Sequence, residues 1–148
     1  MPKIHVTTFI NAPIERVFDL SRNLTICKKA IQNGKEQVLS GTSGLISSGE
    51  TITYKAKHLG KIRVITARIT EMLSPEAYTE EQVKGDLKSY RHEHHFRNVE
   101  NGTIMIDMLE FEGPRDLIGS IAGRFYLKGY LENLLKKKNE LIRQYAES

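Results

Sequence analysis

The feature that most constrains this sequence is a run of five strand-length segments with no helical segment between them. They span residues 50 to 58, 61 to 73, 76 to 84, 87 to 98 and 102 to 112. Turn signals separate them at Leu59-Gly60, Ser74-Pro75, Gly85-Asp86 and Asn101-Gly102. Because parallel strands need long crossover connections, which are usually helical, this run predicts an antiparallel meander.

Two shorter groups of elements precede the meander. Residues 3 to 10 alternate as a strand does, and helical spacing of apolar residues follows over about 13 to 22 and again over 24 to 31. Asn11 stands at the position expected for a helix N-cap, with Pro13 near the first turn. Residues 36 to 39 can form another strand, and 41 to 49 resemble a loop.

After Gly113-Pro114 the chain is expected to form one long amphipathic helix. Its apolar stripe contains Ile118, Ile121, Ala122, Phe125, Leu131, Leu134, Leu135, Leu141 and Ile142. The concave face of the sheet is the large surface that such a stripe can cover. We therefore expect one domain over residues 1–148 with an α+β helix-grip fold, in which a curved antiparallel sheet of about seven strands wraps around the C-terminal helix and two short helices follow the first strand.

Composition argues against several other classes of protein. No run approaches the roughly 18 apolar residues of a membrane span, and no signal peptide precedes the first strand, so a cytoplasmic location is expected. Cys27 is the single cysteine and is expected to be ordinary packing. The net charge of +4 owes much to Lys136, Lys137 and Lys138, which we interpret as a solvated helix face, so no nucleic-acid partner is expected. No Gly-x-Gly-x-x-Gly motif is present, and no cofactor is expected.

Four segments, GETITYKAKH, SYRHEHHF, GTIMIDMLEFEGP and YLENLLKKKNELI, together with the order of elements, resemble the START-like (SRPBCC, Bet v 1-like) superfamily. This superfamily includes polyketide cyclases, dehydratases and coenzyme Q-binding proteins, and the resemblance covers essentially the whole chain. It implies a cavity between sheet and helix that binds lipids, quinones, polyketides or other apolar ligands, with catalysis in some members.

Strand alternation predicts which side chains face that cavity. On the fourth meander strand Tyr90, His92, His94 and Phe96 share the less charged face. A two-residue turn at Asn101-Gly102 would pair Phe96 with Asp107 and His94 with Leu109, and would turn inward Thr103, Met105, Asp107, Leu109 and Phe111. A three-residue turn would instead turn inward Ile104, Ile106, Met108 and Glu110.

The first hairpin of the meander completes the expected wall. Ile52, Tyr54, Ala56 and His58 form its inward set, and a tight turn then presents Arg63, Ile65, Ala67 and Ile69, with Arg63 near the rim beside His58. Ile121 and Phe125 are the expected contributions of the helix. The predicted ligand-binding residues are thus Tyr54, His58, Arg63, Tyr90, His92, His94, Phe96, Met105, Asp107, Leu109, Phe111, Ile121 and Phe125.

Three hypotheses about function follow from this wall. The first is a carrier or sensor of an apolar small molecule; the second is a cyclase or dehydratase using His92 or His94 as base with Asp107 as its partner. The third is a protein-interaction module that docks through the lysine-rich helix. His92 and His94 also point the same way, as metal ligands do, but no metal-binding motif accompanies them, and no metal site is expected.

Overall fold

The computed structural model describes residues 3–31, 36–40, 44–58, 61–114 and 121–148. Its helices are α1 (Ile14–Ser21), α2 (Leu24–Ile31) and α3 (Ile121–Glu147). Its strands are β1 (Lys3–Ile10), β2 (Glu36–Ser40), β3 (Thr51–His58), β4 (Lys61–Leu73), β5 (Ala77–Gly85), β6 (Leu87–Val99) and β7 (Gly102–Pro114). Every element expected from the sequence is present within two residues of its expected bounds, apart from the start of the long helix, which is described from Ile121.

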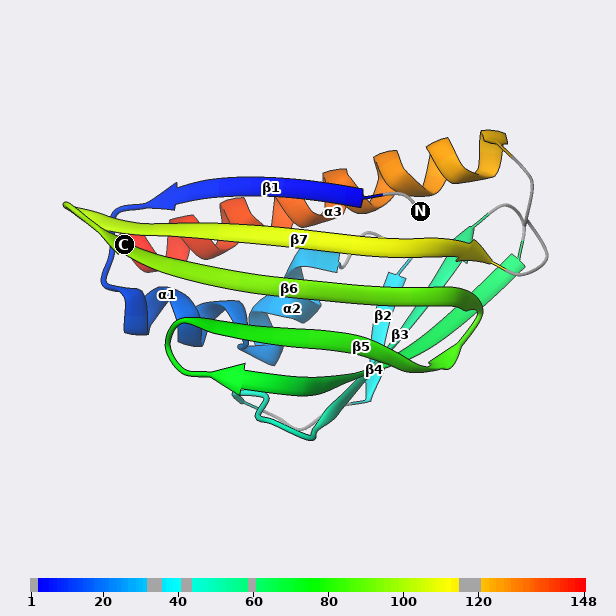
Figure 1. Cartoon of the computed structure of the whole chain (residues 1–148), viewed down its shortest axis with the longest axis horizontal. Helices are drawn as coiled ribbons and strands as arrows, with labels where there is room; N and C mark the ends of the chain where they lie inside the picture. Colours follow the sequence, from blue (N-terminus) through cyan, green and yellow to red (C-terminus); the bar gives the residue numbers. More distant parts are fainter. Residues whose placement is uncertain (1–2, 32–35, 41–43, 59–60, 115–120) are drawn as a thin grey trace.

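Within these ranges the seven strands form one antiparallel sheet in the order β1-β7-β6-β5-β4-β3-β2. The sheet curves strongly, and α3 runs along its concave side with α1 and α2 beside it (Figure 1). Two register shifts between β4 and β5 interrupt the ladder, and such bulges increase the twist of a sheet. This arrangement is the predicted helix-grip α+β fold.

The β6–β7 hairpin confirms the predicted facing but corrects the predicted register. His94 pairs with Asp107 and Phe96 pairs with Met105, so the two loop residues are Glu100 and Asn101. Asn101 takes a positive φ of 66°, which asparagine tolerates better than most residues. The register differs by two positions from the expected one, and because facing repeats every two residues, the inward set on β7 stays the same.

Two local predictions at chain turns have different outcomes. The β3–β4 hairpin is tight, as expected, with His58 opposite Lys61. The expected N-cap at Asn11 is wrong, because α1 is capped by the backbone of Pro13 without a side-chain hydrogen bond. Asn23 performs that role for α2, where its Oδ1 accepts hydrogen bonds from the backbone N–H groups of Thr25 and Ile26.

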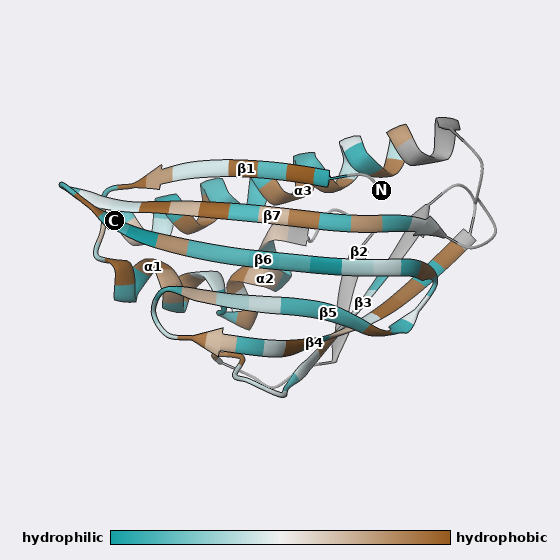
Figure 2. Ribbon diagram, in the orientation of Figure 1, coloured by the Kyte–Doolittle hydropathy of each residue, from teal (hydrophilic) through white to brown (hydrophobic). Residues whose placement is uncertain are grey.

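The space between sheet and helices holds two clusters of buried apolar side chains. The larger one lies under α1, α2 and the C-terminal end of α3, and it includes Phe18, Ile69 and Ile142. The smaller one joins β1 and β7 to the middle of α3 through Ile4, Val6, Leu109, Phe111, Leu127 and Leu135. Figure 2 shows the alternation of apolar and polar residues along β1 and β7 that separates the inner face from the outer one.

The apolar stripe of α3 differs from the predicted one near the start of the helix. Phe125 was expected to face the sheet, but 71% of its surface is exposed, and Leu127 packs there instead. A helix turns by about 100° per residue, so Phe125 and Leu127, which are two positions apart, point to nearly opposite sides of α3. Because Leu127 faces the sheet, Phe125 faces away from it.

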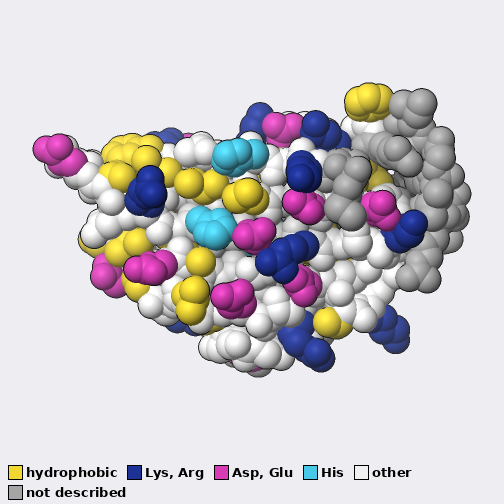
Figure 3. Space-filling view, viewed as in Figure 1, with side chains coloured by type: hydrophobic (Ala, Val, Ile, Leu, Met, Phe, Trp, Pro, Cys, Tyr) yellow, Lys and Arg dark blue, Asp and Glu magenta, His cyan; other side chains and the backbone are white. Residues whose placement is uncertain are grey.

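Charged side chains are scattered over the outer face of the sheet, and several apolar side chains lie exposed among them (Figure 3). Phe9 on β1 and Met108 on β7 are exposed apolar residues, and the exposure of Met108 agrees with the preferred facing of β7, which turns Met105, Asp107 and Leu109 inward. Among the described residues, no helix has both the length and the apolar character needed to cross a membrane.

Candidate functional site

The inner face of three adjacent strands carries four ionisable side chains that lie in direct contact. Glu80 on β5 is opposite His92 on β6, and His94 on β6 is opposite Asp107 on β7. All four are buried although they are titratable. Buried charges are rare unless they are paired, so each of these four side chains depends on the others for its partners.

Their hydrogen bonds run diagonally across the strand pairs. His94 Nε2 lies 2.6 Å from Glu80 Oε2, and His92 Nε2 lies 2.8 Å from Asp107 Oδ1. The other ring nitrogens lie farther from the remaining carboxylates, with 3.7 Å from His92 Nδ1 to Glu80 Oε2 and 3.3 Å from His94 Nδ1 to Asp107 Oδ1. The two imidazole rings stack with centroids 3.7 Å apart, and Tyr78 stacks on the far side of His94 at 4.0 Å.

Two neighbouring side chains hold the carboxylates in place. The Asn139 amide on α3 donates a hydrogen bond of 2.8 Å to Asp107 Oδ2, and the Tyr54 hydroxyl on β3 donates one of 3.1 Å to Glu80 Oε1. Asn139 thereby ties the long helix to the centre of the sheet. Each carboxylate accepts at least one hydrogen bond from outside the histidine pair, which fixes its orientation before any ligand arrives.

Electrostatics give the two carboxylates and the two histidines different protonation states. Burial opposes ionisation of Glu80, but the hydrogen bond from His94 and the nearby positive charges lower its pKa to about 2. Burial likewise opposes ionisation of Asp107, and hydrogen bonds from both histidines hold the pKa of Asp107 far below its usual range. Both carboxylates are therefore ionised at neutral pH.

The histidines shift in opposite directions. Burial favours the neutral form of His94, but its hydrogen bonds to Asp107 and Glu80 outweigh burial and raise its pKa. Burial and the adjacent His94 charge together lower the pKa of His92. His94 is therefore the more basic of the two imidazoles. A neutral His92 that donates its Nε2–H to Asp107 keeps a lone pair on Nδ1.

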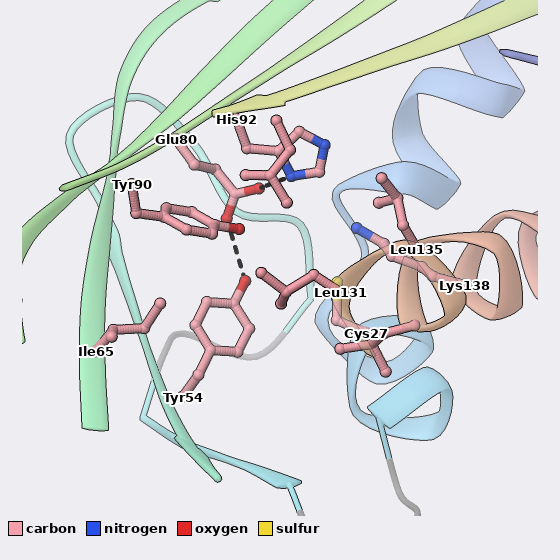
Figure 4. Close-up of a pocket in the computed structure, with 11 residues that line it drawn as sticks. Cys27, Tyr54, Ile65, Glu80, Tyr90, His92, Leu131, Leu135 and Lys138 are labelled. Atoms are coloured by element: carbon pink, nitrogen blue, oxygen red, sulfur yellow. Dashed lines mark hydrogen bonds and ion pairs between the residues drawn. The ribbon is translucent and has the colours of Figure 1, made fainter. Parts of the chain in front are cut away.

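A partly enclosed cavity of about 90 Å³ lies between this cluster and α3. Its floor on the sheet side is Tyr54, Ile65, Glu80, Tyr90, His92 and Leu109; its helical side is Cys27, Leu131, Leu134, Leu135 and Lys138. Figure 4 shows the Lys138 side chain extending from α3 toward the polar end of the cavity, opposite His92. Burial lowers the pKa of the Lys138 ammonium, but nearby Cys27, Tyr78, Glu80 and Asp107 outweigh burial and raise it.

The structure places the predicted ligand-binding residues in several different positions. Tyr54, Tyr90, His92 and Leu109 line the cavity, and His94 and Asp107 lie directly behind it. Phe96 and Met105 belong to the larger apolar cluster, and Phe111 to the smaller one. Arg63 is buried opposite Ala56, where a position at the rim beside His58 was expected. The side chains of His58 and Ile121 lie outside the described residues.

Sequence reasoning missed the acid at the centre of the cluster. A tight turn at Gly85-Asp86 would pair Lys84 with Leu87 and set Glu80 opposite Arg91 on the outer face. In the structure Glu80 is opposite His92 instead, one residue away from the register that such a turn would set. A register shift of one residue reverses the facing of a strand, and the residue types at Gly85-Asp86 do not reveal it.

Lys138 was missed for a different reason. It ends a run of three lysines that we interpreted as a solvated face, yet only Lys136 and Lys137 are exposed, while Lys138 lines the cavity. Asn139 follows it and is also buried. The helical position of Lys138, three residues after Leu135, was the available signal.

Comparisons with solved structures show the fold of this chain. No protein-family model matches the chain, and no curated protein sequence matches it. Solved structures of the same shape are numerous. A protein of Thermus thermophilus, TTHA0849, superposes with a TM-score of 0.73 at 20% identity, covering 95% of this chain and 97% of that one.

Two further solved structures have the same fold. The ginseng (Panax ginseng) major latex-like protein 151 has a TM-score of 0.65 at 12% identity, covering 98% of this chain and 97% of its own. The di-domain ARO/CYC protein StfQ of the steffimycin biosynthetic pathway has a TM-score of 0.74 at 11% identity, covering 98% of this chain and 50% of its own. The chain has the helix-grip fold of these structures. At these identities the helix-grip fold is what the likeness establishes, and the chemistry rests on the site itself.

Proposed function

We propose that the chain binds a small, mostly apolar molecule that carries one neutral polar group, and that it acts as a carrier or sensor of that molecule. The observation that supports this most directly is the two-sided character of the cavity. One side consists of leucines of α3 with Ile65 and Leu109, and the other end consists of Glu80, His92, Tyr54 and Lys138. Mostly apolar walls with a few polar groups that fix orientation are typical of small-molecule sites.

The size of the cavity limits the ligand. At about 90 Å³ the cavity is small, so the enclosed part of a ligand is no larger than one ring or a short acyl chain. A multi-ring polyketide or a long fatty acid requires α3 to move away from the sheet. The smaller ligands among the quinones, phenols and ketones are therefore favoured over bulky lipids.

The charges around the cavity favour a neutral polar group. Two carboxylates, Glu80 and Asp107, are balanced by protonated His94 and the Lys138 ammonium. A ligand carboxylate would add a buried charge without a counterion, which is costly. A carbonyl or hydroxyl group can exchange hydrogen bonds with Tyr54, His92 or Lys138 without changing the net charge.

A thermal-shift comparison of matched ligands tests this proposal. A single-ring quinone or phenol at 100 times its dissociation constant should raise the melting temperature by roughly 5–10 °C, while the corresponding ring carboxylate should not. Leu134→Trp should fill the cavity and abolish the shift, whereas Leu73→Trp, at an exposed position, should leave it intact. A shift of equal size in both variants would show that binding occurs elsewhere and would refute the proposal.

A second candidate is an acid–base enzyme of the cyclase or dehydratase kind. It is favoured by the lone pair on His92 Nδ1, which is oriented by Asp107 and opposite the Lys138 ammonium across the same cavity (Figure 4). Such an arrangement can remove a proton beside a carbonyl while a cation stabilises the developing oxyanion. Asp107→Asn should then reduce turnover far more than ligand affinity, and an equal reduction of both would assign Asp107 to packing.

A further inference from the structure

The side chains of Glu80, His92 and His94 converge on the inner face of β5 and β6. One possible ligand atom from each lies within 4.8 Å of the other two, and all three residues are buried. We propose that these three residues bind a divalent transition-metal ion, with Zn²⁺ as the reference case, and leave a coordination position open toward the cavity. This site does not depend on the proposed apolar ligand.

The outer hydrogen bonds of the cluster orient the histidines as metal ligands. Asp107 Oδ1 faces His92 Nε2 at 2.8 Å and His94 Nδ1 at 3.3 Å, so a single carboxylate faces one nitrogen of each ring. The opposite nitrogens, His92 Nδ1 and His94 Nε2, both point toward Glu80 Oε2. Metal-binding histidines usually donate their second N–H to a carboxylate in this way, which fixes the tautomer and the ring orientation.

A further contact supports Asp107 in this role. Asn139 donates a hydrogen bond to Asp107 Oδ2, so both oxygens of the carboxylate are engaged and its position is set from α3. The result is a layered arrangement in which Asn139 orients Asp107, Asp107 orients two imidazoles, and the imidazoles face Glu80.

The distances in the cluster require only small adjustments to accept a cation. Tetrahedral ligands at about 2.1 Å from a zinc ion lie about 3.4 Å from one another. The Glu80 oxygen is 3.7 Å from His92 Nδ1 and 2.6 Å from His94 Nε2. A bound ion would lengthen the second separation and shorten the first, and the two rings, whose planes are 27° apart, would have to turn toward the ion.

The donor set selects the class of ion. Two imidazole nitrogens and one carboxylate suit zinc, iron and their first-row neighbours, while magnesium and calcium prefer all-oxygen sites. His92 and Glu80 both line the cavity, so water or a ligand carbonyl can reach the remaining position. Three protein ligands and one open position are typical of catalytic metal sites.

Lys138 is the feature that opposes metal binding. Its ammonium lies near enough to Glu80 and Asp107 to influence both carboxylates, so it also repels a dication in the same place. The repulsion between Lys138 and a metal ion can be tested by substitution. Removing the Lys138 charge should strengthen metal binding, whereas removing a ligand should weaken it.

The decisive experiment is calorimetric titration of chelator-treated protein with Zn²⁺, paired with Co²⁺ absorption spectroscopy. One ion should bind per chain, and Co²⁺ should show the intense visible bands of low-symmetry coordination. Imidazole binds a metal ion only in its neutral form, so protons compete with the ion for the histidine ligands. Affinity should therefore decrease as the pH is lowered.

Variants assign the binding to this cluster. Glu80→Gln and His94→Gln should weaken Zn²⁺ binding by more than about 100-fold, and Asp107→Asn should weaken it by about 10- to 100-fold. Lys138→Met should tighten it by about tenfold or more because repulsion is strong inside a protein. His95→Gln is the matched control, since His95 is adjacent on β6 but faces outward beside Glu93, and affinity should not change.

Several outcomes would overturn the metal site. Absence of saturable binding to the wild-type chain would do so directly. Binding that survives His94→Gln but is lost in His95→Gln would assign the ion to the outer face. If the ligand variants fail to fold, the Lys138→Met variant still decides, because unchanged or weaker binding there contradicts the geometry. A failure here leaves ligand binding by the metal-free cavity intact, so the two proposals can be separated.

Discussion

Replacing Glu80 by glutamine tests the cluster most sharply, because it removes one charge and keeps the shape of the side chain. A glutamine oxygen can still accept the hydrogen bond from Tyr54, and the residue remains opposite His92. What is lost is the attraction between the Glu80 carboxylate and protonated His94, whose nearest atoms are 2.6 Å apart. The expected change therefore measures the charge of the cluster.

The expected magnitude follows from the pKa of Glu80. A decrease from 4.5 for an ordinary glutamate to about 2 in the folded chain corresponds to about 3 kcal/mol, at about 1.4 kcal/mol per tenfold change. Because this pKa is lowered by folding, the stabilisation is fully present above about pH 4.5 and is lost as the pH decreases through about 2. The raised pKa of His94 acts in the opposite direction, because its contribution is present below 6.5 and is lost as the pH rises through the folded value.

The pH dependences of the Glu80 and His94 contributions determine the pH at which stability should be compared. Urea unfolding followed by circular dichroism at pH 6 should show Glu80→Gln less stable than wild type by about 3 kcal/mol, because both charges are present there. At pH 2 the difference should shrink markedly. Glu93→Gln is the control, since Glu93 pairs with His95 on the outer face, and its cost should stay below about 1 kcal/mol. A Glu80→Gln difference that is independent of pH, or below about 1 kcal/mol at pH 6, would refute the assignment of charges.

Three further predictions test the surroundings of the cluster by urea unfolding. Asn139→Leu leaves the buried Asp107 Oδ2 without its amide donor and should cost about 1–3 kcal/mol, whereas Asn133→Leu, at an exposed position on the same helix, should change stability by less than about 0.5 kcal/mol. Leu135→Ala removes a buried side chain and should cost about 2–5 kcal/mol; a cost below 1 would place Leu135 outside the core. Leu109→Lys should destabilise the chain by more than about 4 kcal/mol, and Met108→Lys, its outward neighbour, by less than about 0.5 kcal/mol. Similar costs at the two positions would contradict the facing of β7.

Much of the site could be predicted from alternation along single strands. His92 and His94 share a face because they are two residues apart, and this held without knowledge of the partner strand. The expected turn at Asn101-Gly102 was one residue too late in the chain, which shifts the register between β6 and β7 by two residues. A shift of two residues preserves facing, so Asp107 was still predicted on the correct side of the sheet. The hydrogen bonds from His92 to Asp107 and from His94 to Glu80, by contrast, depend on the exact register of the strands. The predicted register, which paired His94 with Leu109, did not predict these hydrogen bonds.

The amino-acid sequence by itself determined the elements of this protein, their order and the faces of most of its strands. These properties arise from backbone preferences and from a two- or 3.6-residue period, both of which act locally. The tertiary structure alone decided that Glu80 faces inward opposite His92, that Lys138 lines the cavity, and that Asn139 on α3 donates a hydrogen bond to Asp107. Those contacts join different elements, 14 residues apart for Glu80 and His94 and 32 for Asp107 and Asn139. Exact strand register and helix rotation set them, so no local pattern carries the information.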